Sequence, residues 1–252
     1  AREQYGRALE LAPDSVQVQD LLARLAAESG DYADAEQRLR ARLAQKPDDL
    51  AAHLNLALVL EKEGRTEEAA QSLLDFVTAS ENPEATGMEL SRLFASKGQY
   101  DRIEHLAQSL LKANASNWVA HYALGLARAG QDDAEGALTH FSEAAKLSEK
   151  VPLARHAEGV ICARLNRLDE ALAAFEAARQ VDVRFVPAYT DAAVVCMRKN
   201  DSAAALDLCR KAIEAAPGDC RPVVLLAMVL VQTDNIPEAV RNVEDLLKRD
   251  PG

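Results

Sequence analysis

Apolar residues recur in this chain at the spacing of amphipathic helices, in segments of about 13 residues separated by short polar turns. Between residues 50 and 62 the apolar positions are filled by leucines and smaller residues: Leu54, Leu56, Ala57, Leu58, Val59 and Leu60. Comparable segments follow one another from end to end. The pattern predicts a succession of short α-helices.

The turns between these segments keep a period of 34 residues. Each turn has a residue that tolerates a left-handed backbone, namely Gly30, Gly64, Gly98, Asp132, Asn166, Asn200 and Asp234. Five residues further on, the same period gives Ala35, Ala69, Ile103, Ala137, Ala171, Ala205 and Ala239. A fixed period of this length predicts stacked helix pairs rather than a globular enzyme fold.

Counted from position 1 to position 34, the repeats cover residues 16–49, 50–83, 84–117, 118–151, 152–185, 186–219 and 220–252, after a half repeat at 1–15. Position 8, on the first helix, is small in every repeat: Ala23, Ala57, Ser91, Gly125, Gly159, Ala193 and Ala227. Position 20, on the second helix, is the alanine series above. Two rows of small residues let antiparallel helices approach closely, so we expect a single solenoid over residues 1–252.

Composition and charge narrow the class of partner. The 252 residues are 48% hydrophobic but only 4% aromatic, which suits thin, closely packed helices. The formal net charge is −11, from 29 basic and 40 acidic residues. Because neutralisation of phosphates drives general nucleic-acid binding, that partner class is disfavoured. No apolar run reaches the roughly 20 residues of a membrane span.

The four cysteines match no metal or redox spacing. Cys162 and Cys196 stand one period apart at a position that should pack inward. We interpret all four, including Cys209 and Cys220, as reduced residues that act as small hydrophobes. Unpaired cysteines favour the cytoplasm, with the bacterial periplasm as the alternative, and the sequence assigns no compartment.

The residues at these fixed positions resemble the tetratricopeptide repeat. The fourth repeat matches the signature of that family best, with Leu124-Gly125, Ala137, Phe141 and Ala144. The resemblance implies an all-α fold, a right-handed α-solenoid (superhelix) of antiparallel helix pairs. It also implies that the first helices line a concave groove and the second helices form the convex side.

The central repeats depart from this pattern. The third has Gly87 in the aromatic slot, Ile103 for alanine and Ala107 for phenylalanine. The closing proline at position 32 is replaced in four places, by Glu81, Ala115, Glu149 and Val183. We expect altered repeat-to-repeat geometry there.

We find no motif of a nucleophile, a phosphate-binding loop or a metal site, and therefore expect no enzyme activity, cofactor or metal. His53 and His121 share position 4 and are interpreted as packing residues. Glu158 is the exception, because it occupies a position where most repeats have leucine. Several interpretations of Glu158 stay open. Its carboxylate could pair with Arg155 or Arg164 inside the fold, or the first helix of the fifth repeat could be rotated. It could instead be a carboxylate that binds a partner, or mark a local weak point in the stack of repeats.

In the family arrangement, positions 2, 5, 9, 12 and 13 of the first helices face the groove. The predicted partner-binding residues are Arg92, Tyr122, Leu126, His156, Val160, Arg164, Val194, Met197, Arg198 and Met228. An apolar centre flanked by arginines suits an extended apolar segment or an amphipathic helix of a partner protein. Chaperone-binding members of the tetratricopeptide repeat family hold a C-terminal carboxylate with a set of Lys and Asn side chains. That set is incomplete in this sequence.

The sequence therefore favours a non-enzymatic protein–protein interaction scaffold, part of a larger bacterial repeat protein. Its uncapped ends would expose apolar helix faces, which favours self-association. Two alternatives stay open. The Ala- and Arg-rich style resembles periplasmic scaffolds of exopolysaccharide export, which recruit a modifying enzyme or guide the polymer. The repeats could instead be the targeting arm of an enzyme whose catalytic domain lies outside this sequence.

Overall fold

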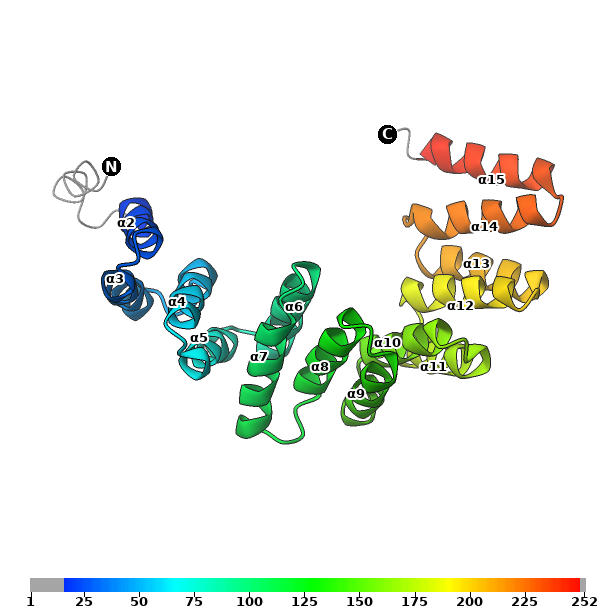
Figure 1. Ribbon diagram of the computed structural model, residues 1–252. Helices are drawn as coiled ribbons and strands as arrows, with labels where there is room; N and C mark the ends of the chain where they lie inside the picture. The colour runs from blue at the N-terminus through cyan, green and yellow to red at the C-terminus, as the bar shows by residue number, and fades with distance from the viewer. Residues whose placement is uncertain (1–15, 250–252) are drawn as a thin grey trace. The chain divides into compact units, whose positions relative to one another are not determined.

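The computed structural model describes residues 16–249 as fourteen α-helices joined by short turns (Figure 1). No strand occurs within that range. The all-α repeat fold expected from the sequence is therefore confirmed. The predicted half repeat at residues 1–15 lies outside the described residues.

The chain divides into two compact units, with the boundary between Gly130 and Gln131. The first unit contains α2 (Val16–Glu28), α3 (Tyr32–Gln45), α4 (Leu50–Lys62), α5 (Thr66–Ala79), α6 (Pro83–Ser96), α7 (Tyr100–Ala113) and α8 (Trp118–Gly130). The second contains α9 (Ala134–Leu147), α10 (Pro152–Arg164), α11 (Leu168–Val181), α12 (Val186–Arg198), α13 (Ser202–Ala215), α14 (Cys220–Gln232) and α15 (Ile236–Arg249). The boundary falls inside the fourth predicted repeat, and the interpretation as one continuous domain stays a prediction.

The turn inside each helix pair is made by a residue in the left-handed conformation. Its φ angle ranges from 59° at Asp234 to 80° at Gly30. The seven residues concerned are the periodic ones, Gly30, Gly64, Gly98, Asp132, Asn166, Asn200 and Asp234, which confirms the prediction. The next residue closes the turn, as where the Arg167 N–H donates to the Cys162 carbonyl at 2.8 Å.

Close approach of the paired helices depends on the small residues. The alanines at position 20 are almost fully buried, including Ala35, Ala171 and Ala205 at 0% exposure. A Cβ atom built on Gly159 in α10 would lie 2.6 Å from Cε1 of Phe175 in α11. Since no side chain fits at that distance, the aromatic ring occupies the space that the glycine leaves.

The third helix pair packs differently. α6 contacts α8 more extensively than it contacts its own partner α7. Ile103 is fully buried at the position where the other pairs have alanine. The altered repeat-to-repeat geometry expected for the central repeats stays a prediction.

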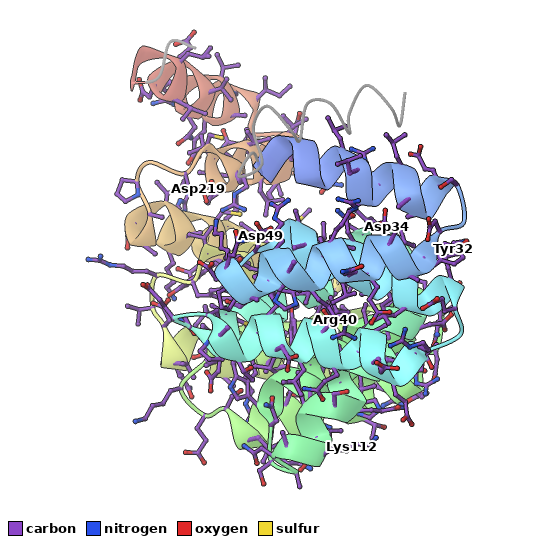
Figure 2. All side chains as sticks on the ribbon, turned by 90° about the vertical axis from the view of Figure 1, so that its left-hand side faces the viewer. Tyr32, Asp34, Arg40, Asp49, Lys112 and Asp219 are labelled. Carbon is purple, nitrogen blue, oxygen red and sulfur yellow. The ribbon has the colours of Figure 1, made fainter. Side chains whose placement is uncertain are left out.

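A buried ion pair joins successive pairs at the N-terminal end of the described chain. Asp49 caps α4 by accepting from the Ala52 amide at 3.1 Å, and Arg42 of α3 donates to it at 2.6 Å. Burial acts to raise the pKa of Asp49, but these two donors outweigh it and hold the pKa below its usual value. Figure 2 shows Asp49 at the start of α4 and Asp34 with Arg40 along α3.

The cysteines are all free, and three of them lie in the core. Burial raises the pKa of the Cys162 and Cys209 thiols to about 11, which makes them unreactive. The interpretation as small hydrophobes is confirmed for these two and for Cys196. It is wrong for Cys220, which begins α14 and is exposed.

The conformation of the turns gives a first prediction. Gly64 has a φ of 77° and no atom within 4 Å of a Cβ built on it, so Gly64→Ala adds backbone strain without a clash. We expect a loss of roughly 1 to 2 kcal/mol in the free energy of unfolding, measured by urea titration. Gly218→Ala is the control, because a Cβ there also meets nothing and φ is not positive. Equal losses in the two variants would contradict the argument.

Candidate functional site

The ten predicted groove residues are divided between the two units. Arg92 lies on α6, and Tyr122 and Leu126 lie on α8, all in the first unit. The other seven lie on the first helices of the second unit: His156, Val160 and Arg164 on α10, Val194, Met197 and Arg198 on α12, and Met228 on α14. Each group is therefore described on its own.

In the first unit, Tyr122 is a packing residue. Its side chain is only 4% exposed, and its ring meets that of Trp118 edge-on at a centroid distance of 6.5 Å. The exposed Arg92 lies over the same ring, with its guanidinium carbon 5.9 Å from the centroid. The expectation that Tyr122 offers a surface to a partner is wrong, because the neighbouring Trp118 and Arg92 cover it. Leu126 is half-buried.

In the second unit, three apolar residues form an exposed row at position 9. Val160, Val194 and Met228 are 40%, 45% and 62% exposed on α10, α12 and α14. The residue that follows each of them is buried, namely Ile161, Val195 and Val229. In each of these three repeats, the apolar side chain at position 9 therefore faces outward, while the apolar residue that follows it packs in the core. We call Val160, Val194 and Met228 the position-9 row.

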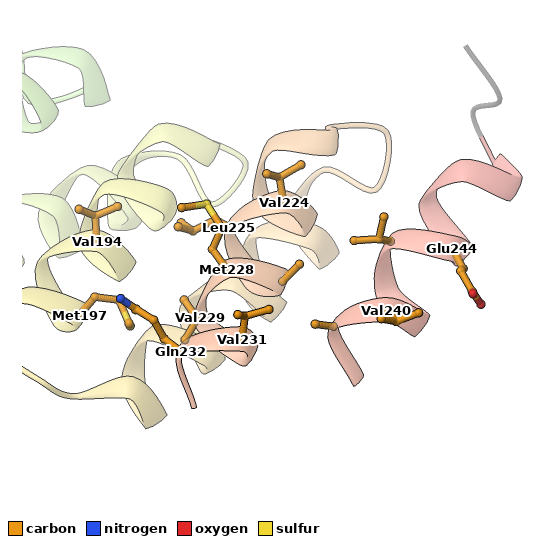
Figure 3. Close-up of a pocket in the computed structure, with 13 residues that line it drawn as sticks. Val194, Met197, Val224, Leu225, Met228, Val229, Val231, Gln232, Val240 and Glu244 are labelled. Carbon is orange, nitrogen blue, oxygen red and sulfur yellow. The ribbon is translucent and has the colours of Figure 1, made fainter. Parts of the chain in front are cut away.

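The C-terminal part of this row opens into an apolar pocket of about 890 Å³. Its walls come from three helices, with Val194 and Met197 on α12, Met228 and Val231 on α14, and Val240 and Val243 on α15. Figure 3 shows α14 between the other two helices, with Val240 and Glu244 on the α15 side. Three predicted groove residues, Val194, Met197 and Met228, therefore share one cavity.

The arginines at position 13 bind the turn of the preceding repeat. Arg198 donates to the Ala163 carbonyl at 2.7 Å and to the Asn166 side-chain oxygen at 3.0 Å. Arg164 approaches the carboxylate of Asp132 at 3.8 Å. Both arginines are exposed, but their contacts give them a role in joining repeats that the sequence pattern did not indicate.

His156 is held in place by its neighbours. Its Nε2 atom lies 2.7 Å from Oδ2 of Asp191 on α12, and its ring contacts Phe175 and Phe185 at centroid distances of 5.5 and 5.3 Å. The side chain is 17% exposed. This geometry makes His156 a bridge between α10 and α12 with one edge at the surface.

Glu158 pairs within the fold, as one of the open interpretations expected. Arg155 donates to it at 3.4 Å, and Ser142 of α9 donates at 2.6 Å. The serine hydroxyl was not recognised from sequence, because it lies on the preceding second helix. These two donors explain how a carboxylate is accommodated at a position that is usually leucine.

The hydrogen-bond partners of His53 were likewise not predicted from the sequence. His53 is buried, with Nδ1 3.0 Å from the Ser72 hydroxyl and Nε2 2.9 Å from the Pro47 carbonyl. The interpretation of His53 as a packing residue is confirmed.

Among the described residues no group of His, Cys, Asp or Glu side chains is arranged to hold a metal ion. Across residues 16–249, each helix is too short or too polar to span a bilayer.

Helix pairs on a constant period, closed by left-handed turns and packed through small residues, define an α-helical repeat solenoid. The model of the family described as "Tetratricopeptide repeat" matches residues 21–83, 88–152 and 153–219. These segments cover most of the chain, which therefore belongs to the tetratricopeptide repeat family. No curated protein sequence matches it.

Solved structures support the same fold. A crystal structure of MamA superposes with a TM-score of 0.55 at 18% identity, covering 65% of this chain and 96% of that chain. MamA residues 41-end from Desulfovibrio magneticus RS-1 give a TM-score of 0.53 at 16% identity, with coverage of 66% and 93%. Yeast Tom70 gives 0.58 at 15% identity and covers 98% of this chain and 54% of that chain. At these identities the likeness concerns the fold alone.

The arginine contacts can be tested through stability. Arg198→Ala removes two hydrogen bonds between α12 and the preceding repeat, so we expect the free energy of unfolding to fall by roughly 1 kcal/mol in urea titration. The control is Arg184→Ala, which alters an exposed arginine in the α11–α12 turn. If both substitutions leave stability unchanged, the contacts of Arg198 contribute nothing to the joining of repeats.

Proposed function

We propose that this chain is a non-catalytic interaction module whose position-9 row binds an apolar segment of a partner protein. The tetratricopeptide repeat fold supports a role as a protein–protein interaction scaffold. The position-9 row indicates that the segment it binds is apolar. Val160, Val194 and Met228 offer exposed apolar side chains at the same place on three successive helices.

The single observation that carries the proposal is the exposure of this row beside buried neighbours. Solvation of apolar surface is unfavourable, at about 25 cal/mol per Å². Isolated exposed valines are common, but an apolar series on aligned helices that runs into an apolar pocket is typical of a binding surface. An extended or helical segment with apolar side chains fits such a surface.

Binding of a polysaccharide is less well supported. A sugar-guiding role favours exposed aromatic rings in the groove, and Tyr122 is the one Tyr, Phe or Trp among the ten predicted groove residues. Since Tyr122 is 4% exposed, it cannot stack on a sugar ring. The proposal therefore takes a protein segment as the ligand.

The test uses a random peptide library displayed on phage and selected against the full chain. We expect the selected peptides to be rich in apolar residues. The double variant Val160→Glu/Val194→Glu places two charges in the row and should weaken their binding by about tenfold or more, measured by fluorescence anisotropy.

A matched control is Val183→Glu, which changes an exposed valine in the α11–α12 turn outside the row. It should bind the selected peptides as the unchanged protein does. Selected peptides that bind the double variant with unchanged affinity would overturn the proposal.

A further inference from the structure

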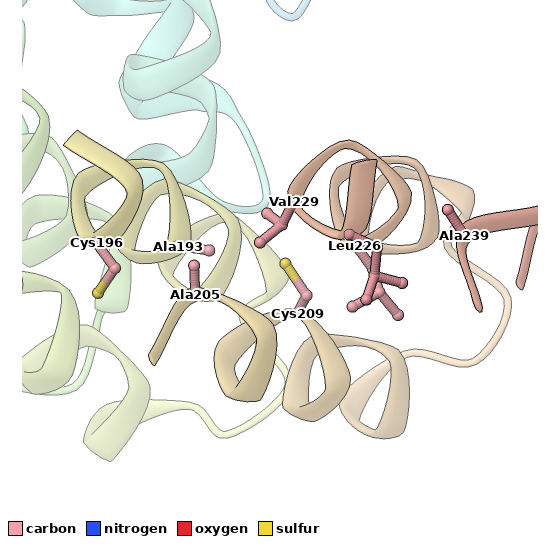
Figure 4. Packing of buried hydrophobic residues seen from close by; sticks show 8 residues of the cluster. Ala193, Cys196, Ala205, Cys209, Leu226, Val229 and Ala239 are labelled. Atoms are coloured by element: carbon pink, nitrogen blue, oxygen red, sulfur yellow. The ribbon is translucent and has the colours of Figure 1, made fainter. Parts of the chain in front are cut away.

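Helix α12 has an open face as well as a buried one. Its residues Ala193 and Cys196 pack in a buried cluster with residues of α13 and α14 (Figure 4). Asp191, Val194 and Arg198 stand at i, i+3 and i+7, the spacing of a single helix face. The side chain of Asp191 is 41% exposed, Val194 is 45% exposed, and Arg198 is exposed as well. A carboxylate, an apolar side chain and a guanidinium therefore follow one another along the open face of α12.

The guanidinium of Arg198 contacts neutral groups. Its Nη1 atom donates to the Ala163 carbonyl at 2.7 Å, and its Nη2 atom donates to the side-chain oxygen of Asn166 at 3.0 Å. Asp191 lies seven residues earlier on the same helix, a rise of about 10 Å, which is too far for an ion pair. Since the two contacts carry no negative charge, the positive charge of Arg198 is not offset by them.

The neighbouring cations are paired differently. Arg164, the equivalent residue on α10, lies 3.8 Å from the carboxylate of Asp132. Lys199, which follows Arg198, pairs with the carboxylate of Asp169. Of these three cations, Arg198 is therefore the one whose contacts are with neutral groups, and it stands one helical turn from Val194 of the position-9 row.

The opposite side of Val194 has a negative charge. Asp191 lies one turn before Val194, and its Oδ2 atom is 2.7 Å from Nε2 of His156 on α10. Because like charges repel and opposite charges attract, a carboxylate of a bound segment is disfavoured on the Asp191 side and favoured on the Arg198 side. The two flanking charges thus distinguish the two sides of the row at α12.

We propose that the segment bound by the position-9 row is acidic as well as apolar, and that Arg198 binds one of its carboxylate side chains. The proposal rests on the groove function above and adds the charge of the partner. A guanidinium has five N–H donors in a planar fork. The two contacts of Arg198 with the preceding repeat leave donors of this fork for a carboxylate beside Val194.

The probe is the tightest-binding peptide from the phage selection, synthesised with an amidated C-terminus so that its carboxylates are all on side chains. We expect the selected peptides to share an Asp or Glu near their apolar residues. Replacing that residue by Asn or Gln should weaken binding to the unchanged protein by about two- to fivefold in fluorescence anisotropy. Against Arg198→Gln, the acidic and the amide peptide should bind equally, because the charge that distinguishes them is gone.

Two matched variants separate this contact from a general effect of charge. Lys199→Gln removes the same charge from the adjacent residue and should leave the affinity of the acidic peptide unchanged. Asp191→Asn removes the charge on the other side of Val194 and should not weaken that peptide. Urea unfolding should confirm that all three variants fold. Equal weakening by Arg198→Gln and Lys199→Gln would assign the effect to net charge and refute the contact.

The outcomes distinguish this proposal from the groove function on which it rests. Selected peptides that are apolar but share no acidic residue would overturn the proposal and leave the groove function standing. So would equal binding of the acidic and the amide peptide to the unchanged protein. An amide peptide whose affinity is restored by a free C-terminal carboxylate would assign the contact to a chain end and also overturn it. The groove function fails separately, through unchanged binding to Val160→Glu/Val194→Glu.

Discussion

The fold depends on how closely two short helices can approach within each pair. Where the facing positions of a pair are small, a bulky residue of the partner helix fills the space. Phe175 of α11 does so against Gly159 of α10. In the third pair, where position 20 is Ile103, α6 packs more extensively on α8 than on its own partner α7. A solenoid has no central core, so each repeat relies on this local fit and on the helix that covers it. The other features follow from that dependence.

The turns show how one constraint can be met in two ways with different consequences. Left-handed backbone is required at every turn, and Gly30, Gly64 and Gly98 meet that requirement without a side chain. In the second unit Asp132 and Asn166 accept the same φ at some cost in strain. They supply an oxygen that Arg164 and Arg198 can reach. At Asp132 and Asn166 the turn is therefore also a point of contact between repeats.

The period was sufficient to predict the helices, the left-handed turns and the small residues, because each of these depends on position within the repeat alone. It could not predict which side chains meet across repeats. Tyr122 was expected on the open face and is buried, since Trp118 and Arg92 happen to cover it. The partner of Glu158, Ser142, and the partner of His53, Ser72, are likewise individual residues outside the repeat pattern.

The period becomes most informative where the structure breaks it. An exposed valine has little meaning by itself, because folded proteins leave much apolar surface in water. Val243 is different, since the six equivalent residues are buried under a following helix. The repeats therefore provide their own internal reference for what a covered face looks like.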